Sequence, residues 1–182
     1  MKKITTRNLC LRAAAIFFFL FLITSWTVST DKKATVNDSQ LVAQTLDQFN
    51  EAAAQADFNK YFNFFTEDAI FIGTDATENW NKKDFMVWAK PMFDKKKTWN
   101  FKAIERHIFF NKTNDLAWFD ELLDTQMKIC RGSGVLIKQG DQWKVQHYVL
   151  SMTMPNEQIK AAVKIKAPIE DELIRNLTGL KK

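Results

Sequence analysis

A histidine near the end of the chain is the residue whose type and setting most readily suggest chemistry. His147 stands in the run from Trp143 to Met154, where successive side chains of an extended strand point to opposite faces. Trp143, Val145 and His147 would then share one largely apolar, inward face. An imidazole there can act as an acid, a base or a hydrogen-bond donor. The competing interpretation is a core histidine that a neighbouring carboxylate satisfies.

An acidic run, Trp118 to Asp124, supplies candidate partners for that imidazole. Glu121 and Asp120 are adjacent in an expected strand, so they point to opposite faces and either can be the interior one. A carboxylate in an apolar pocket has a raised pKa and can act as a general base near neutral pH. His147, Glu121 and Asp120 are therefore our candidate catalytic residues, against the alternative that the carboxylates face solvent or a dimer partner.

Two arginines lie where they could reach the same carboxylates. Arg106 adjoins His107, and Arg131 precedes Gly132. Each could bind an anionic ligand with two hydrogen bonds or form a structural salt bridge with Asp120 or Glu121. We keep both arginines as candidate ligand-binding residues.

Three tryptophans are further candidates for ligand binding. Trp80, Trp88 and Trp118 could provide a hydrophobic surface for a ligand, although aromatic side chains at such spacing usually pack in a core. The chain has two histidines and two cysteines without the spacing of metal ligands, and it has no glycine-rich phosphate loop. We therefore expect neither a metal nor a cofactor.

The first 29 residues have the pattern of an export signal. Four basic residues and no acidic ones precede an unbroken apolar run over 13–23. The small residues Thr27 and Ser29 that follow have the spacing for cleavage after about Ser29. The alternative is an uncleaved inner-membrane anchor over 13–28, which is shorter than the ~20 residues of a typical span. We expect export to a bacterial periplasm or envelope, with membrane contact only if this segment is retained.

The export signal also explains most of the basic charge. The whole chain has 26 basic and 21 acidic residues, and without the signal 22 basic residues remain. No basic stripe is left to bind nucleic acid. Cys10 would leave with the signal, so Cys130 would have no partner for an internal disulfide.

The remaining chain divides into a polar linker over 30–40, one domain over 41–156 and a helical extension over 157–182. Periodicity predicts helices over 41–53, 58–65 and 82–93, with Pro91 kinking or ending the third. Ala69–Ile72 and Thr77–Trp80 predict a short hairpin. Four longer strands follow at 99–110, 116–127, 134–138 and 143–154, with a connection near Arg131–Gly132. The extension reads as one or two helices broken at Pro168.

Helices grouped ahead of an antiparallel meander imply an α+β fold, with the helices on one face of a curved antiparallel sheet. Such a sheet, rolled against a long helix, encloses a pocket. With 46% hydrophobic residues and 16 phenylalanines, the chain is rich enough in apolar side chains to fill that core.

Several segments resemble the SnoaL-like branch of the nuclear transport factor 2 superfamily over about 41–157. They are GTDATE after the first strand, AWFDE in the second long strand, and RGSGVL leading to WKVQHY. The resemblance implies a cone-shaped roll around a pocket and a homodimer through the sheet. The superfamily includes cyclases, isomerases, dehydratases and non-catalytic binding proteins, and fold does not choose among them. The tyrosine that the isomerases use has no counterpart in the first helix.

Two functions follow as hypotheses. The first is an exported protein, with or without catalytic activity, that binds a small hydrophobic or amphipathic molecule in the cone. The alternative is an isomerase, cyclase or dehydratase that uses His147 with Glu121 or Asp120 as an acid–base pair.

Overall fold

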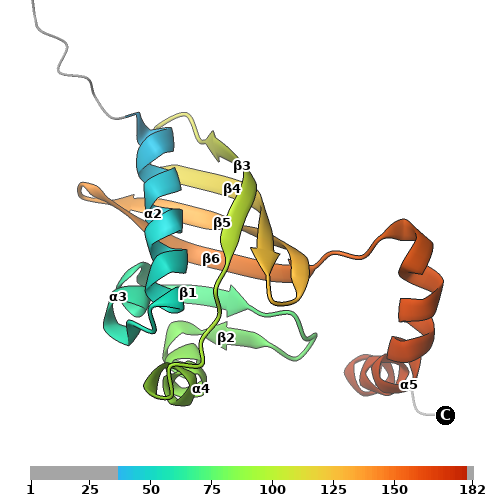
Figure 1. Ribbon diagram of the computed structural model, residues 1–182. Helices are drawn as coiled ribbons and strands as arrows, with labels where there is room; N and C mark the ends of the chain where they lie inside the picture. Colours follow the sequence, from blue (N-terminus) through green and yellow to red (C-terminus); the bar gives the residue numbers. More distant parts are fainter. Residues whose placement is uncertain (1–36, 180–182) are drawn as a thin grey trace, which may run out of the picture. The chain divides into compact units, whose positions relative to one another are not determined.

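A computed structural model describes residues 37–179 (Figure 1). The expected export signal, and the linker as far as residue 36, lie outside these residues. Within 37–179 no helix is both long and apolar enough to span a membrane.

Each of the first three helices begins at an N-cap residue whose side chain bonds to the first turn. The Oδ1 atoms of Asn37, Asp57 and Asn81 accept hydrogen bonds from backbone N–H groups in the first turn of each helix. Because Asn37 is the first cap, the last three residues of the expected linker are already helical. The helices are α2 (Asp38–Ala54), α3 (Phe58–Asn63), α4 (Lys82–Asp94) and, after the short 3-10 helix η1 (Asn156–Gln158), α5 (Ile159–Thr178).

Neither helical proline interrupts its helix. α4 continues through Pro91 to Asp94, and α5 continues through Pro168, where a break was expected. Pro91 lies in the last turn of α4, and the helix ends three residues after it. No residue of α5 is buried.

Six strands form one curved sheet in the order β2-β1-β6-β5-β4-β3. The four long strands are an antiparallel meander, as predicted, whereas β1 lies parallel to β6. β5 begins at Lys128, so Arg131 and Gly132 lie within a strand and not in the expected connection. The strands are β1 (Phe65–Ile72), β2 (Asn79–Asn81), β3 (Lys102–Phe110), β4 (Leu116–Thr125), β5 (Lys128–Gln139) and β6 (Gln142–Met152).

A bulge in β6 overturns the predicted orientation of His147. Val145 pairs with Leu136, but His147 pairs with Val135, so Gln146 is an extra residue in β6. One extra residue exchanges the two faces of everything that follows it. Tyr148 is therefore buried and faces inward, and His147 faces the other side of the sheet, only partly buried.

The core lies between α2 and the inner face of the sheet, across which α2 runs in Figure 1. Aromatic rings make up much of it. Phe49 stacks on Tyr61 at 4.5 Å between centroids, and Phe71 stacks on Phe85 at 4.1 Å. Such pairs add roughly 0.5–1.5 kcal/mol each beyond the area that they bury. The dense aromatic cluster of α3 is thereby explained as core.

Candidate functional site

An aromatic pocket of about 150 Å³ lies where α4, the β1–β2 turn and the start of β3 meet. Trp80 and Trp88 are 4.7 Å apart between ring centroids, and Trp99 is 6.5 Å from Trp88. Its lining is mostly apolar: Phe71, Gly73, Thr74, Glu78, Trp80, Phe85, Trp88, Trp99, Phe101, Gln126, Met127 and Leu150.

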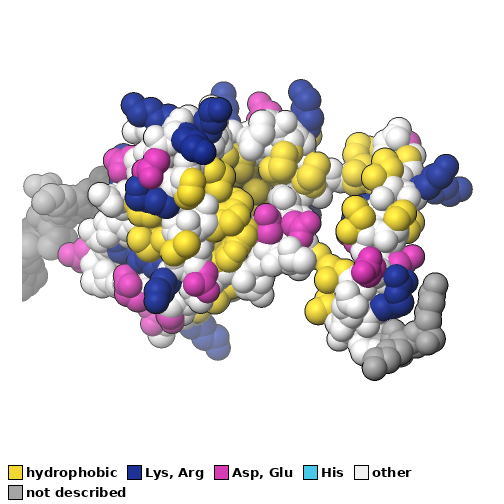
Figure 2. All heavy atoms as spheres, turned by 90° about the horizontal axis from the view of Figure 1, so that it is seen from below, with side chains coloured by type: hydrophobic (Ala, Val, Ile, Leu, Met, Phe, Trp, Pro, Cys, Tyr) yellow, Lys and Arg dark blue, Asp and Glu magenta, His cyan; other side chains and the backbone are white. Residues whose placement is uncertain are grey.

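The surface around this pocket is unusually apolar for solvent-exposed residues. Trp88 is 41% exposed and Val87 is 70% exposed, both on α4. Hydrophobic side chains gather on this face of the molecule in Figure 2. Glu78 is the only acidic residue in the lining; its carboxylate lies directly over Gly73, where a Cβ atom would be 2.1 Å from Oε2. A side chain at this position would therefore displace the carboxylate of Glu78 from its place over the turn.

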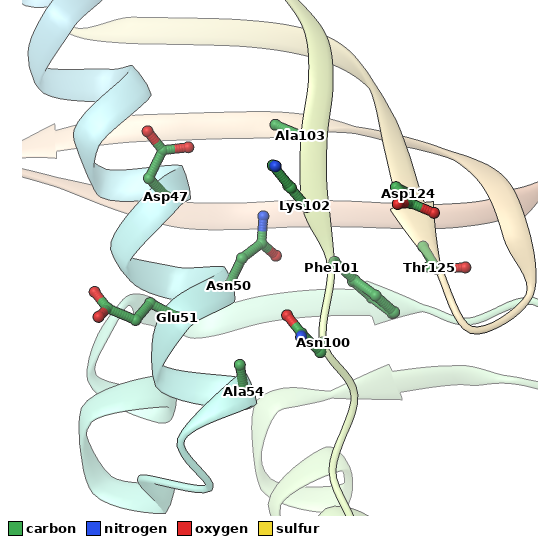
Figure 3. A pocket seen from close by; sticks show the side chains of 10 residues that line it. All are labelled: Asp47, Asn50, Glu51, Ala54, Asn100, Phe101, Lys102, Ala103, Asp124 and Thr125. Carbon is green, nitrogen blue, oxygen red and sulfur yellow. The ribbon is translucent and has the colours of Figure 1, made fainter.

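A second, polar cavity of about 560 Å³ lies between the C-terminal half of α2 and the start of β3 (Figure 3). Phe101 lines both this cavity and the aromatic pocket. The remaining lining residues are polar, charged or small: Asp47, Asn50, Glu51, Ala54, Asn100, Lys102, Ala103, Asp124 and Thr125. We call it the polar cavity.

Asn50 and Thr125 are the buried polar residues in this lining. Thr125 Oγ1 donates to the Lys128 carbonyl, whereas Asn50, which is 5% exposed, extends its amide from α2 toward the segment 100–103 in Figure 3. Neither Oδ1 nor Nδ2 has a hydrogen-bond partner among residues 37–179. A buried amide without partners is costly, so its presence at this cavity needs an explanation.

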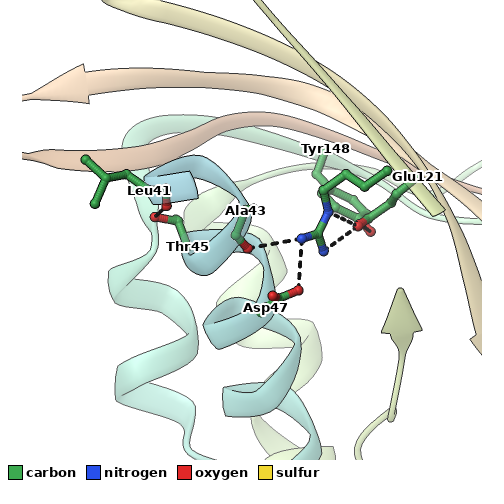
Figure 4. A network of polar contacts seen from close by, with 7 residues as sticks. Leu41, Ala43, Thr45, Asp47, Glu121 and Tyr148 are labelled. Atoms are coloured by element: carbon green, nitrogen blue, oxygen red, sulfur yellow. Dashed lines mark hydrogen bonds and ion pairs between the residues drawn. The ribbon is translucent and has the colours of Figure 1, made fainter. Parts of the chain in front are cut away.

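An ionic network centred on the buried side chains of Arg106 and Glu121 adjoins the polar cavity through Asp47, which lines that cavity (Figure 4). The guanidinium of Arg106 donates to Glu121 Oε2 from Nε at 2.8 Å, and its Nη2 is 2.7 Å from the same oxygen. Its Nη1 donates to Asp47 Oδ1 at 2.9 Å and to the Ala43 carbonyl at 3.1 Å. Tyr148 completes the network by donating from Oη to Glu121 Oε1 at 3.2 Å.

A glycine makes this network possible. Gly132 pairs with Glu121 across β4 and β5, and a Cβ at Gly132 would be 2.5 Å from Tyr148 Oη and 3.0 Å from Glu121. A Cβ at Gly134 would be 2.1 Å from the backbone carbonyl oxygen of His147, at the bulge. The segment RGSG therefore lets β5 approach both the buried pair and the bulged strand.

Burial governs the titration of the network. It raises the pKa of Glu121, against the opposing attraction of Arg106 and the hydrogen bond from Tyr148. Desolvation also acts against the charged form of Arg106, but Glu121 and Asp47 outweigh it, so that the pKa of Arg106 is raised and it stays protonated. Burial, followed by the charge of Glu121, raises the pKa of Tyr148 well above its usual range.

The network does not have the geometry of an available acid–base centre. The carboxylate of Glu121 accepts hydrogen bonds from Arg106 Nε and Tyr148 Oη, and Arg106 Nη2 lies 2.7 Å from Oε2 as an ion pair. Because the side chain of Glu121 has no exposed surface, a substrate proton could reach the carboxylate only after these side chains moved. The Arg106–Glu121 pair thus matches the structural salt bridge that we considered for Arg106.

The predicted catalytic residues do not converge. Glu121 is interior, whereas Asp120 points to the outer face of the sheet and pairs with His107 Nδ1 at 3.1 Å. His147 lies beyond the bulge and has no hydrogen bond to either carboxylate within the described part of the chain. The expectation that His147 shares an inward face with Val145 was wrong, because the bulge at Gln146 intervenes.

The predicted ligand-binding residues also do not come together at one site. Trp80 and Trp88 line the aromatic pocket, and Arg106 lies in the buried network. Trp118 is 44% exposed and stacks on Phe109 at 5.8 Å, and Arg131 is exposed. Both belong to the outer side of the sheet, since the buried neighbours of each point inward.

Sequence reasoning missed Tyr148 and Asn50. The bulge that turns Tyr148 inward left no readable mark in the sequence. Asn50 did leave one, because it continues the stripe of Leu46, Phe49 and Ala53 that faces the core. A polar residue at such a position is a sign of a buried polar contact.

The fold defines an α+β domain in which helices pack on a curved, unclosed six-stranded sheet. Residues 42–155 match the family model of the SnoaL-like domain, and the chain belongs to that family. No curated protein matches the chain in sequence.

Solved structures agree on the fold alone, because their identity is low. An NTF2-like protein of unknown function from Pseudomonas putida KT2440 is 16% identical, with a TM-score of 0.53 over 64% of this chain and 87% of its own. An NTF2-like family protein from Streptomyces avermitilis, described as a candidate dehydratase, is 13% identical, with a TM-score of 0.56 over 65% and 97%. A domain with a cystatin-like fold from Nostoc punctiforme is 17% identical, with a TM-score of 0.56 over 80% and 94%.

Proposed function

We propose that this protein binds a small, largely apolar molecule in the aromatic pocket. The observation that supports this most directly is the convergence of Trp80, Trp88 and Trp99 on one small, open space with a single acidic residue in its lining. Aromatic faces that border an open space and stay partly exposed are typical of ligand surfaces. The volume of about 150 Å³ suits a ligand built around one ring.

The acid–base alternative has less support. It requires His147 and a carboxylate to face one cavity. Glu121 lies on the opposite face of the sheet from His147, and Asp120, which shares the outer face with His147, lines neither the aromatic pocket nor the polar cavity. Glu121 is also held by Arg106 and Tyr148. Binding without an acid–base step at these residues is therefore the function that we infer.

The proposal can be tested with single-ring probes such as indole, toluene and phenol. Binding would raise the Tm and change the tryptophan fluorescence, since three tryptophans line the pocket. We expect Trp88→Ala to weaken binding about tenfold or more, which corresponds to about 1.4 kcal/mol. Trp118→Ala, on the outer face, is the matched control and should bind normally. No saturable binding by any probe, or equal binding by Trp88→Ala, would contradict the proposal.

We also propose that the mature domain is exported and forms a homodimer. Export is inferred from the first 29 residues, and cell fractionation with N-terminal sequencing would separate a cleaved signal from an anchor over 13–28. The dimer surface would be the outer face of the sheet, where Phe109 and Trp118 are 46% and 44% exposed. A Trp118→Lys variant should then become monomeric in light scattering, and a monomeric parent would refute the dimer.

A further inference from the structure

One acidic side chain lies among the rings of the aromatic pocket. Among residues 37–179, Glu78 is the only charged residue in that lining, and no lysine or arginine lines the pocket. Its backbone closes the β1–β2 turn, because the Gly73 N–H donates to the Glu78 carbonyl at 3.0 Å. The turn therefore fixes the position of Glu78, and the carboxylate lies over Gly73, which also lines the pocket.

The carboxylate of Glu78 has unused capacity to accept hydrogen bonds. Oε2 accepts from the Asp75 N–H at 3.2 Å, and Oε1 accepts from no residue of 37–179. Each carboxylate oxygen can accept more than one hydrogen bond, so an incoming N–H group would need to displace no existing partner. Glu78 is only half-buried, which leaves it within reach of a ligand.

The charges around the pocket favour a cation. The same turn contains Asp75, whose pKa is lowered chiefly by the hydrogen bond from Thr77 Oγ1, so that it adds a second negative charge. Six lysines lie within two residues of a lining residue, and none of them lines the pocket. Lys82 and Lys90 are bonded to Glu67 and Asp94, Lys102 lines the polar cavity, and Lys83, Lys97 and Lys128 are exposed.

The tryptophans add to this preference. The face of an indole ring is electron-rich and attracts an ammonium group within about 6 Å of the ring centroid. Trp80 and Trp88 are 4.7 Å apart between centroids, and Trp99 is 6.5 Å from Trp88. Three indoles in one small pocket therefore leave a bound cation close to at least one of them. Both the rings and the carboxylate favour a positive charge in the ligand.

We propose, resting on the function proposed above, that the ligand of the aromatic pocket is an arylalkylamine, in which a short chain joins one aromatic ring to an ammonium group. The ring packs among the tryptophans, and the ammonium group donates to the carboxylate of Glu78. A short chain is sufficient, because Glu78 and the tryptophans line the same pocket of about 150 Å³.

Three probes of similar size and different charge test this proposal on the purified protein. 2-Phenylethylamine carries the ammonium group, 2-phenylethanol has a neutral hydroxyl in its place, and phenylacetate has a carboxylate. Binding is measured by tryptophan fluorescence and calorimetry. We expect 2-phenylethylamine to bind at least fivefold more tightly than 2-phenylethanol, and phenylacetate to bind most weakly. The advantage of the amine should decrease as NaCl is added, because salt screens the attraction between charges.

A substitution at Glu78 tests the role of its charge. Glu78→Gln removes the charge and keeps an oxygen that can accept from the Asp75 N–H. It should weaken 2-phenylethylamine at least fivefold and leave 2-phenylethanol unchanged, which would also show that the pocket is intact. Glu105→Gln, at an exposed position of β3 outside the pocket lining, is the matched control and should bind all three probes as the parent does.

Failure of this inference can be distinguished from failure of the proposed function. If neither the amine nor any neutral ring probe shows saturable binding, both are wrong. If neutral ring probes bind and the amine has no advantage, or if Glu78→Gln keeps that advantage, this inference alone is wrong. If Trp88→Ala binds 2-phenylethylamine as tightly as the parent, the amine binds elsewhere and this inference is also wrong.

Discussion

Two neighbouring carboxylates on β4 have opposite surroundings. Glu121 is 1% exposed and bound by Arg106 and Tyr148, whereas the side chain of Asp120 is 47% exposed and pairs with His107. A buried charge depends on its partners, because water cannot replace them. An exposed pair is screened by water and contributes little. The inner face of β4 should therefore be sensitive to substitution and the outer face tolerant.

The largest effect is expected at the buried pair. Glu121→Ala leaves the guanidinium of Arg106 largely buried without its main partner, and we expect the free energy of unfolding to fall by about 3–5 kcal/mol. Urea denaturation of the mature domain measures this. The double variant Arg106→Met/Glu121→Met should recover most of the loss, because it removes both charges and fills the space. If Glu121→Ala lowered the free energy of unfolding by less than about 1 kcal/mol, which is roughly what an exposed ion pair contributes, the inner face of β4 would be no more sensitive than the outer face, and the prediction would be wrong.

A smaller loss is expected from Gly132→Ala. The new Cβ would lie 2.5 Å from Tyr148 Oη, and overpacking of this kind costs about 1–3 kcal/mol. Adding Tyr148→Phe removes the atom that the new methyl group meets, so the double variant should be less destabilised than the sum of the two changes. If chemical denaturation showed that the losses of the two single variants simply add in the double variant, the new methyl group would not be in conflict with Tyr148 Oη, and this prediction would be wrong.

Tyr148→Phe alone should cost about 1 kcal/mol. It removes the donor to Glu121 Oε1 while Arg106 still satisfies the carboxylate. The same substitution should leave the affinity for the single-ring probes unchanged, because Tyr148 does not line the aromatic pocket. A loss of binding by this variant would indicate that the network positions a ligand.

The smallest effect is expected at the outer pair. The hydrogen bond and charge of Asp120 raise the pKa of His107 above its ordinary value, and Glu105 adds to the shift. Any stability from this pair is fully present below the unfolded pKa of about 6.5 and is lost as the pH rises through the folded pKa. Asp120→Asn should lower the pKa of His107 in an NMR titration and leave the Tm unchanged at neutral pH. An unchanged pKa would contradict the pairing.

Most of the architecture could be predicted from sequence because it depends on local patterns. Alternation predicted the four-stranded meander, and periodicity predicted α2 and α4 to within a few residues. The same alternation placed Glu121 and Asp120 on opposite faces, although it could not say which was interior. The parallel pairing of β1 with β6 depends on which segments meet in space, and no local pattern encodes it.

The site was less predictable for a definite physical reason. The sequence by itself determined the family and marked Trp80 and Trp88 as candidate ligand-binding residues, whereas Asn50 was missed although it lies on the core stripe of α2. Only the tertiary structure decided that Tyr148 and not His147 faces the interior. That choice follows from one extra residue, Gln146, in the pairing of β6 with β5. A single insertion in a ladder reverses every later side chain, and the energy that selects it comes from packing against the rest of the domain.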